Sequence, residues 1–218
     1  MMDEVKIKTS KETFLSLLDF IHREGANVEQ LKQYLLSSDF FEAPASTVYH
    51  NSFEGGLCQH CLNVYRNLVQ LVNDKFPVEE GCQPIYSQET LILVSLFHDL
   101  SKTNFYEKYY ANKKIYDEAK GDKKDEHGKF YWASVPSYKV RDQKERFILG
   151  THGQNSAYML SSFIPLTQEE TAAIVNHHAG MDNDTARNNS LTEIYNTYPL
   201  AVLLHLADMM ATYIDERM

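Results

Sequence analysis

The apolar positions near the start of the chain recur with the period of an α-helix. Phe14, Leu17 and Ile21 follow Ser10, which is a candidate N-cap for a first helix. The segment 25–27 interrupts this pattern, and apolar residues at steps of three and four then predict a second, shorter helix. We therefore expect residues 1–39 to form N-terminal helices that pack on the rest of the chain.

A longer amphipathic stretch opens at Gly55 and Gly56. Its apolar side chains recur at alternating steps of four and three, which is typical of a helix with one buried face, and Pro77 ends it. Residues 40–54 before it have no clear period and predict an ordered loop. The buried stripe should consist of Leu57, Cys61, Val64, Leu68 and Leu71.

Three further segments also predict helices. Residues 88–100 are largely apolar and favour a buried helix. Thr151 can cap a helix over 152–163. Thr167 and Glu170 have the spacing of a capping box, in which each side chain accepts a hydrogen bond from the backbone of the other, so another helix should begin there.

Residues 103–149 differ from the rest because they are rich in Tyr and Lys and only weakly periodic. Residues 115–116 and 129–141 could form the strands of a hairpin around the turn-prone segment 121–128. The aromatic residues here could line a substrate wall or form a small core of their own. We therefore expect a small β-like insertion at about 103–149.

Near the end of the chain, Gly180 and residues 182–189 predict a loop, and Pro199 suits the first turn of a final helix through Tyr213. No internal repeat or linker divides the sequence. The predicted fold is therefore mainly α, a helical bundle with a small β-like insertion, in which residues 40–218 form one domain.

Composition narrows the possible partners. The 218 residues include 21 Lys or Arg and 30 Asp or Glu, a formal net charge of −9. Binding of duplex DNA needs a basic surface, and this composition does not predict one.

Three cysteines, no secretion signal and no apolar run near the length of a membrane span favour a cytoplasmic protein that does not enter a membrane. Cys58 and Cys61 suit a core better than a zinc knuckle, because no second Cys pair exists. The oligomeric state stays open.

Residues able to bind a metal lie beside the apolar stripes. A lone His on an inner helical face is more often a hydrogen-bonded core residue, but His98 and Asp99 are adjacent inside an apolar segment. Buried carboxylates need compensation, and a metal ion supplies it. Imidazole nitrogen and carboxylate oxygen suit Zn, Mn, Fe, Co or Ni. The four candidates with inner-face positions are His60, His98, Asp99 and Asp208.

The order of these four residues resembles the HD-domain metal-dependent phosphohydrolases, whose motif is H…HD…D. The segments GGLCQH, HDLSK and LAD are similar to the family's GGLxxH, HDxxK and LAD. The stretch before them, with PA and His50, is similar to HD proteins that carry PA…HH…GGL, and Asn51 stands where those have a second His. The resemblance spans about residues 40–213 and implies an HD-domain helical bundle that hydrolyses phosphate esters.

A second set of histidines follows the order of two-metal HD proteins, H…HD…H…HH…D. The GYP signature does not follow the His pair, which argues against a cyclic-di-GMP phosphodiesterase of the HD-GYP type. A pair of His at a helix end is also favoured by the helix dipole alone. By resemblance, one ion takes His60, His98, Asp99 and Asp208, and a second takes His152, His177, His178 and the bridging Asp99.

Lys102 is expected near the same site, three residues after Asp99. The resemblance implies catalytic roles for both, with the Lys ammonium holding a phosphate oxygen of the substrate. On position alone, a solvated helix-end Lys is an equally good interpretation. A second phosphate could be held by Arg187, or by a basic residue of the insertion such as Lys139 or Arg141.

The sequence therefore predicts a metal-dependent phosphohydrolase that cleaves a phosphate mono- or diester, with a nucleotide or a nucleic-acid-derived molecule as its substrate. One or two divalent transition metal ions would be its cofactor. Two alternatives remain. One is a di-iron oxygenase of the myo-inositol oxygenase type, which has a similar ligand order. The other is a non-catalytic binding module that has retained its metal.

Overall fold

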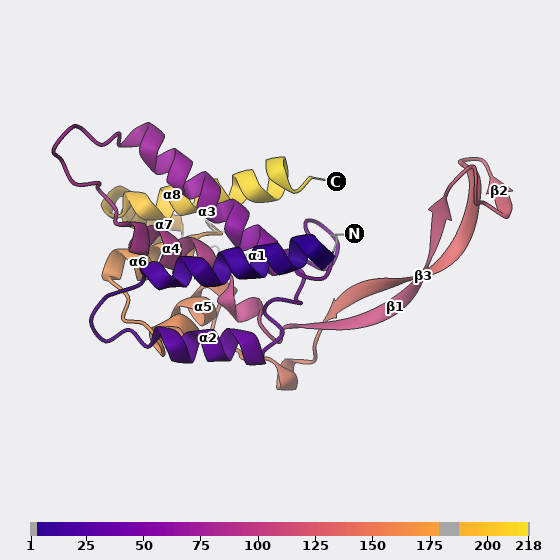
Figure 1. Ribbon diagram of the computed structural model, residues 1–218, viewed down its shortest axis with the longest axis horizontal. Helices are drawn as coiled ribbons and strands as arrows, with labels where there is room; N and C mark the ends of the chain where they lie inside the picture. The colour runs from indigo at the N-terminus through magenta and orange to yellow at the C-terminus, as the bar shows by residue number, and fades with distance from the viewer. Residues whose placement is uncertain (1–3, 179–187, 218) are drawn as a thin grey trace.

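A computed structural model describes residues 4–178 and 188–217. Within them the chain is mainly α-helical with one small three-stranded sheet, which confirms the predicted fold class (Figure 1). No helix in these two ranges is both long and apolar enough to cross a membrane. The helices are α1 Glu4–Leu17, α2 Val28–Ser37, α3 Gly56–Lys75, α4 Gln88–Phe97, α5 His152–Ser161, α6 Gln168–Asn176, α7 Asn188–Thr197 and α8 Pro199–Met210.

Helix α3 lies at the centre of the helical body, where it packs against α1, α4 and α8. Its predicted apolar stripe is buried from Leu57 to Leu68, with Leu71 packed against it. The N-terminal helices join the same core, because the ring of Phe14 contacts the rings of Phe40 and Phe97 edge-on, at centroid distances of 5.1 and 5.7 Å. One continuous hydrophobic core therefore supports every helix that carries a candidate ligand.

Two of the three predicted N-caps are present, and several helix limits differ from the prediction. Thr151 and Thr167 both form capping boxes, with Gln154 and Glu170. Ser10 is no N-cap, because α1 begins at Glu4 and the Ser10 hydroxyl instead donates to Gln59 Oε1 at 3.0 Å. Helix α4 ends at Phe97 and is followed by a 3₁₀ turn over 100–102. Helix α7 begins inside the predicted loop.

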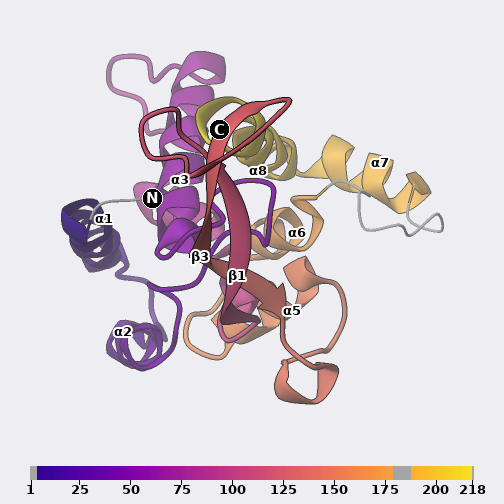
Figure 2. The same cartoon turned by 90° about the vertical axis from the view of Figure 1, so that its right-hand side faces the viewer.

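The sheet forms an arm that projects from the helical body (Figure 1), and Figure 2 turns it toward the viewer. We call residues 106–140 the β arm. Its strands pair antiparallel in the order β1-β3-β2, with Tyr106 opposite Val140 and Tyr116 opposite Phe130. The hairpin is longer than predicted because few of its residues are buried, and β3 alternates only between half-buried and exposed positions over 131–136. The strands are β1 Tyr106–Tyr116, β2 Lys123–Asp125 and β3 Gly128–Val140.

The base of the β arm is fixed to the helical body close to the end of α4. The backbone N–H of Arg141 donates to the carbonyl of Phe105 at 3.0 Å and closes the base. Lys108 forms a 2.7 Å ion pair with Glu54 in the loop before α3. The arm therefore starts directly beside the turn that carries Lys102.

Candidate metal centre

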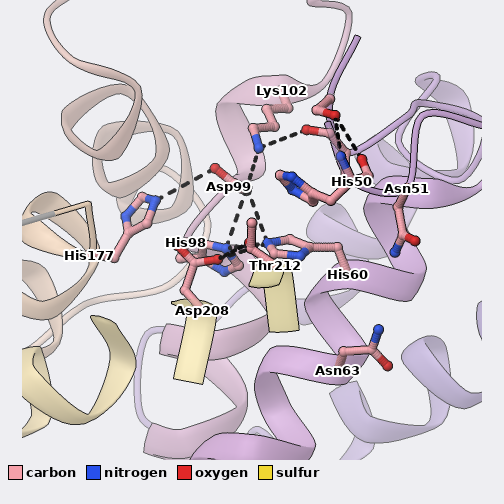
Figure 3. A network of polar contacts seen from close by, with 12 residues as sticks. His50, Asn51, His60, Asn63, His98, Asp99, Lys102, His177, Asp208 and Thr212 are labelled. Carbon is pink, nitrogen blue, oxygen red and sulfur yellow. Dashed lines mark hydrogen bonds and ion pairs between the residues drawn. The ribbon is translucent and has the colours of Figure 1, made fainter. Parts of the chain in front are cut away.

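The seven metal ligands predicted from the sequence converge on one place in the helical body (Figure 3 shows five of them). They come from segments that are far apart in the sequence, and each segment belongs to a helix or a helix end. Buried helix ends place side chains more rigidly than surface loops do. His60 lies in α3, His98 and Asp99 follow α4, His152 opens α5, His177 and His178 follow α6, and Asp208 lies in α8.

The first group of ligands lies around the Nε2 atom of His60. This atom is 3.2 Å from His98 Nε2 and 3.2 Å from Asp208 Oδ1. The Oδ2 atom of Asp99 lies 3.7 Å from His60 Nε2 and 3.4 Å from His98 Nε2. All four side chains are buried, so this is a compact set of nitrogen and oxygen donors.

Hydrogen bonds to the far side of the rings fix which nitrogen of each imidazole faces the centre. His98 Nδ1 lies 2.8 Å from the Ser95 carbonyl, and His177 Nδ1 lies 2.7 Å from the Ile174 carbonyl. A carbonyl can only accept, so Nδ1 carries a proton in both rings and the Nε2 atom of each ring points inward. The inward lone pairs of neutral imidazoles are what a transition metal binds.

The second group faces the other oxygen of Asp99. His152 Nε2 and His177 Nε2 lie 3.0 Å apart, and they are 3.8 and 3.7 Å from Asp99 Oδ1. His178 Nε2 lies 3.7 Å from Asp208 Oδ2. The Asp99 carboxylate therefore lies between two clusters of imidazoles, as expected for a bridging ligand.

The Oδ1 atom of Asp99 is the clearest sign that a cation fits here. It is buried and accepts no hydrogen bond from the described residues. Leaving a charged oxygen unpaired in the interior is costly, and a divalent cation removes that cost. His60, His98 and Asp99 could hold one ion, and so could His152, His177 and His178.

The ionisation of the site favours a cation as well. Burial alone would raise the pKa of Asp99, but the positive charge of Lys102 and nearby imidazoles lower it well below the usual range. The pKa of Asp208 is likewise lowered, against burial, by its hydrogen bond with His60. Burial and the neighbouring His177 lower the pKa of His152 to about 2. At neutral pH the centre thus holds two carboxylates and at least one neutral imidazole.

Lys102 lies at the edge of this centre, as predicted. Its Nζ atom is 2.6 Å from Asp99 Oδ2 and donates to the carbonyl of Ala45 at 2.9 Å. Burial alone would lower the pKa of the ammonium, but the charge of Asp99 raises it above its usual value. The Lys102 ammonium therefore keeps its positive charge at the boundary between the centre and the adjoining pocket.

A pocket of about 480 Å³ opens onto the centre. Its inner wall is polar and includes ligands of both groups, whereas its outer wall carries aromatic and apolar side chains. Arg217 adds a second cation to the lining. The volume is sufficient for a small organic molecule. The lining residues are Val48, Tyr49, His50, His60, Asp99, Lys102, His178, His205, Asp208, Met209, Thr212, Tyr213 and Arg217.

The other candidates for a second phosphate contact are not in this pocket. Arg187 lies outside the described residues. Lys139 is on the β arm, paired with Glu107 at 3.1 Å, and Arg141 lies 4.0 Å from Asp39 at the base of the arm. Neither lines the pocket.

Two residues of the site have no place in the predicted ligand set. Glu216 accepts a hydrogen bond from His60 Nδ1 at 3.1 Å and another from Asn63 at 2.8 Å, and no helical pattern marks it. The His50 ring lies 5.0 Å from the His60 ring, and both of its nitrogens are buried without a hydrogen-bond partner among the described residues. Burial and the nearby His60 lower the pKa of His50 to about 4. The PA motif before His50 was the one sequence signal for this loop.

Cys58 and Cys61 are free thiols buried in the hydrophobic core, as predicted. Neither belongs to the groups that could hold a metal. No protein-family model, no curated protein and no solved structure matches the chain. The resemblance to the HD-domain phosphohydrolases therefore rests on its motifs, and the case for a metal rests on the donor atoms described above.

Proposed function

We propose that the chain is a metal-dependent phosphohydrolase of the HD-domain type, which cleaves a phosphate mono- or diester. One observation carries this proposal. The Asp99 carboxylate has imidazole nitrogens beside both of its oxygens, and the ammonium of Lys102 lies 2.6 Å from Oδ2. The imidazole and carboxylate donors that can bind divalent ions therefore lie beside the Lys102 ammonium, which can bind an anionic substrate.

His60, His98, Asp99 and Asp208 would hold a first ion, and a second would take the three remaining histidines and the other oxygen of Asp99. A divalent transition metal, when bound, makes a water molecule acidic enough to act as hydroxide near neutral pH. The chain itself keeps both carboxylates ionised and turns each Nε2 inward. The carboxylates and the Nε2 atoms of His98 and His177 are thus in place before any ion arrives, whereas His60 must release a proton to bind one.

Lys102 would bind a non-bridging phosphate oxygen of the substrate. In the structure its ammonium neutralises Asp99, and its second hydrogen bond, to the Ala45 carbonyl, holds Nζ at the pocket wall. Once cations neutralise Asp99, that charge is available to an anionic ligand. Arg217 lines the same pocket and offers a second contact for a phosphate.

The outer wall of the pocket supports a substrate with a flat organic part. Tyr49 and Tyr213 line it and are 84% and 57% exposed, so their rings are open to a ligand. Aromatic rings of this kind stack on planar groups such as nucleobases. A nucleotide, or a small fragment of a nucleic acid, combines that planar part with the phosphate that Lys102 requires.

A di-iron oxygenase is the alternative that the donor set also supports, because iron accepts the same imidazole and carboxylate ligands. The two functions differ in what the pocket must neutralise. A polyol carries no charge, whereas the pocket places Lys102 and Arg217 on its wall. That pair of cations favours the phosphate ester.

The test starts with elemental analysis of the purified chain. The metal-free protein is then loaded with Mn, Fe, Zn, Co or Ni and screened for phosphate release from nucleotides and for cleavage of a phosphodiester. Hydrolysis should require an added ion and disappear in Asp99→Asn, which keeps the side-chain shape. Asp19→Asn is the matched control, because Asp19 is an exposed carboxylate paired with Lys32.

The metal-loaded protein should consume no oxygen with myo-inositol. Oxygen consumption would favour the oxygenase. Bound metal without turnover on any ester would favour the non-catalytic module.

A further inference from the structure

The β arm differs from the helical body in charge. Residues 106–140 carry eight Lys and six Asp or Glu, whereas the rest of the chain carries 13 Lys or Arg and 24 Asp or Glu. Five of the six acidic residues lie at or next to the tip of the arm, within residues 117–126. The long strands β1 and β3 hold five Lys and a single acid, Glu107. An acidic protein thus extends a locally basic ribbon into solvent.

The same two strands carry eight aromatic side chains. Tyr110, Tyr116 and Trp132 are 67%, 44% and 54% exposed. Side chains two residues apart share a face, and Trp132 pairs with Lys114, so these three rings lie on one face of the ribbon. Tyr110 and Tyr116 are six residues apart along β1, which corresponds to roughly 20 Å.

These aromatic rings are not the core of a small domain. Figures 1 and 2 show the arm projecting away from the helices, and within the described part of the chain Tyr110, Tyr116 and Trp132 stay exposed. The ring contacts within the arm are local, such as that of the Lys114 ammonium, 4.1 Å from the centre of the Phe130 ring. Exposed aromatic surface concentrated on one face is typical of a binding site.

Two lysines next to these positions in sequence have no carboxylate within ion-pair distance among the described residues, and they leave the strands on the opposite face of the ribbon. Lys113 lies next to Lys114 on β1, and Lys129 lies next to Phe130 on β3. By contrast, the lysines at the base and middle of the arm are paired, Lys108 with Glu54 and Lys114 with Asp125. The arm therefore offers stacking surfaces together with uncompensated positive charge.

We propose that the β arm binds a single-stranded polynucleotide. Its bases stack on Tyr110, Tyr116 and Trp132. Its phosphates follow the edge of the ribbon, within reach of the long side chains of Lys113 and Lys129, which leave the strands on the other face. Single-strand binding proteins combine these two elements, aromatic platforms for bases and cations that follow the backbone. The bases of a duplex are stacked on one another and cannot reach such rings, so the occupant is single-stranded.

This proposal does not depend on the proposed hydrolysis. The arm does start beside the candidate metal centre, because the Tyr106 hydroxyl donates to the same Ala45 carbonyl as Lys102, at 3.4 Å. A strand bound along the arm would thus end near the pocket. Binding to the arm itself can be measured without any metal.

Trp132 is the only tryptophan of the chain, so its fluorescence reports directly on the arm. The full-length protein is titrated in EDTA with oligothymidylate or oligouridylate of about twelve nucleotides, within the range of single-strand site sizes. Both should quench the fluorescence, and whichever binds more tightly identifies DNA or RNA as the source. Raising the salt from about 50 to about 200 mM should weaken binding.

Variants then separate stacking from charge. Tyr110→Ala should weaken binding by roughly fivefold or more. Replacing Lys113 and Lys129 by Ala should reduce the salt dependence. Tyr158→Ala is the matched control, because Tyr158 is 54% exposed on α5 and lies away from the arm, and it should bind like the unmodified chain. Helical circular dichroism should be the same in all variants, since the arm is outside the hydrophobic core.

An abasic oligonucleotide of the same length carries the phosphates without the bases and should bind much more weakly. Equal binding of the abasic strand, or of polyglutamate, would overturn the proposal in favour of a general attraction for polyanions. A duplex that binds as tightly as the single strand would overturn it too, and so would the absence of quenching by both oligonucleotides.

Discussion

Glu216 accepts a hydrogen bond from Nδ1 of His60 at 3.1 Å, and this contact joins two residues that are 156 positions apart. The carboxylate sits after a π-helical turn, 211–215, that continues α8. It holds the His60 ring so that Nε2 faces Asp208 and His98. A carboxylate behind a ligating imidazole fixes its orientation and makes it a stronger donor.

The first prediction concerns this contact. Glu216→Gln keeps a hydrogen-bond acceptor but removes the charge behind His60, so affinity for the first ion should fall about tenfold to a hundredfold. Isothermal titration with Mn or Zn measures the change. Asp215→Asn, one residue earlier and bonded to Asn67, is the control and should retain full affinity. Equal losses in both variants would mean that the whole turn had moved.

Lys102 should separate binding of substrate from binding of metal. Lys102→Ala removes the ammonium that faces the pocket and contributes no metal donor, so turnover on phosphate esters should fall at least about tenfold while metal content stays unchanged. Steady-state kinetics and elemental analysis on one preparation give both values. The exposed Lys75→Ala serves as the control. Loss of metal together with activity would make Lys102 a structural residue.

His152 tests whether the centre holds two ions. In the proposed assignment the ion at His152, His177 and His178 takes one carboxylate oxygen, Asp99 Oδ1, whereas the ion at His60 takes oxygens of both Asp99 and Asp208. The first of these sites should therefore bind a cation more weakly. A metal titration should therefore show two affinities, and His152→Ala should abolish the weaker one. His22→Ala, at an exposed position, is the control. One affinity that is insensitive to His152→Ala under excess Mn would falsify the two-metal interpretation.

The metal-free protein should lose stability at alkaline pH. Burial opposes the proton on His60, but hydrogen bonds with Asp208 and Glu216 outweigh this effect and raise its pKa from 6.5 to about 10. A raised histidine pKa stabilises the fold fully below about pH 6.5, and this contribution is lost as the pH rises toward 10.

Urea denaturation in EDTA between about pH 7.5 and 10 measures this slope. The free energy of unfolding should fall with pH in the unmodified chain and less steeply in His60→Gln. Saturating metal should reverse the trend, because the ion takes the place of the proton and binds better as pH rises. A slope that is the same in both chains would exclude His60 as its source.

A buried ion pair joins the N-terminal segment to the helix that leads to His177. Both terminal nitrogens of Arg23 lie 2.7 Å from the Glu170 carboxylate, which is 1% exposed. Arg23→Met leaves that charge without its partner and should lower the free energy of unfolding by about 3 kcal/mol. Lys32→Met breaks the surface pair with Asp19 and should cost less than about 1 kcal/mol, as measured by thermal or urea denaturation.

Part of the candidate metal centre was predictable because His60 and Asp208 lie at helical positions that the apolar pattern identifies. His60 falls between Leu57 and Val64 on the buried face of α3, so its direction followed from the spacing alone. That His152 and His177 meet Asp99 was implied only by the order of the HD motifs, since spacing within one helix does not determine contacts between helices.

Other features depend on interactions that the sequence pattern does not record. The contact of Glu216 with His60 requires the extra turn at 211–215, and no cap or glycine marks it. The start of α1 was missed because Glu4 to Thr9 lacks a continuous apolar stripe. The arm was underestimated because its strands are stabilised by pairs such as Tyr116 with Phe130, without a buried face.

The wide separation of the ligands along the chain has a consequence for biosynthesis. When the ribosome has made the first 180 residues, all the histidines of the centre exist, but α8 with Asp208 has not been added. A partial chain of that length contains Asp99 but lacks Asp208, whose oxygen lies closer to His60 Nε2, and α3 lacks the helix that covers it. Metal capture would therefore follow completion of α8. A cell short of the ion would then accumulate finished chains without the stabilisation that a bound ligand gives, and these are the chains that proteases attack first.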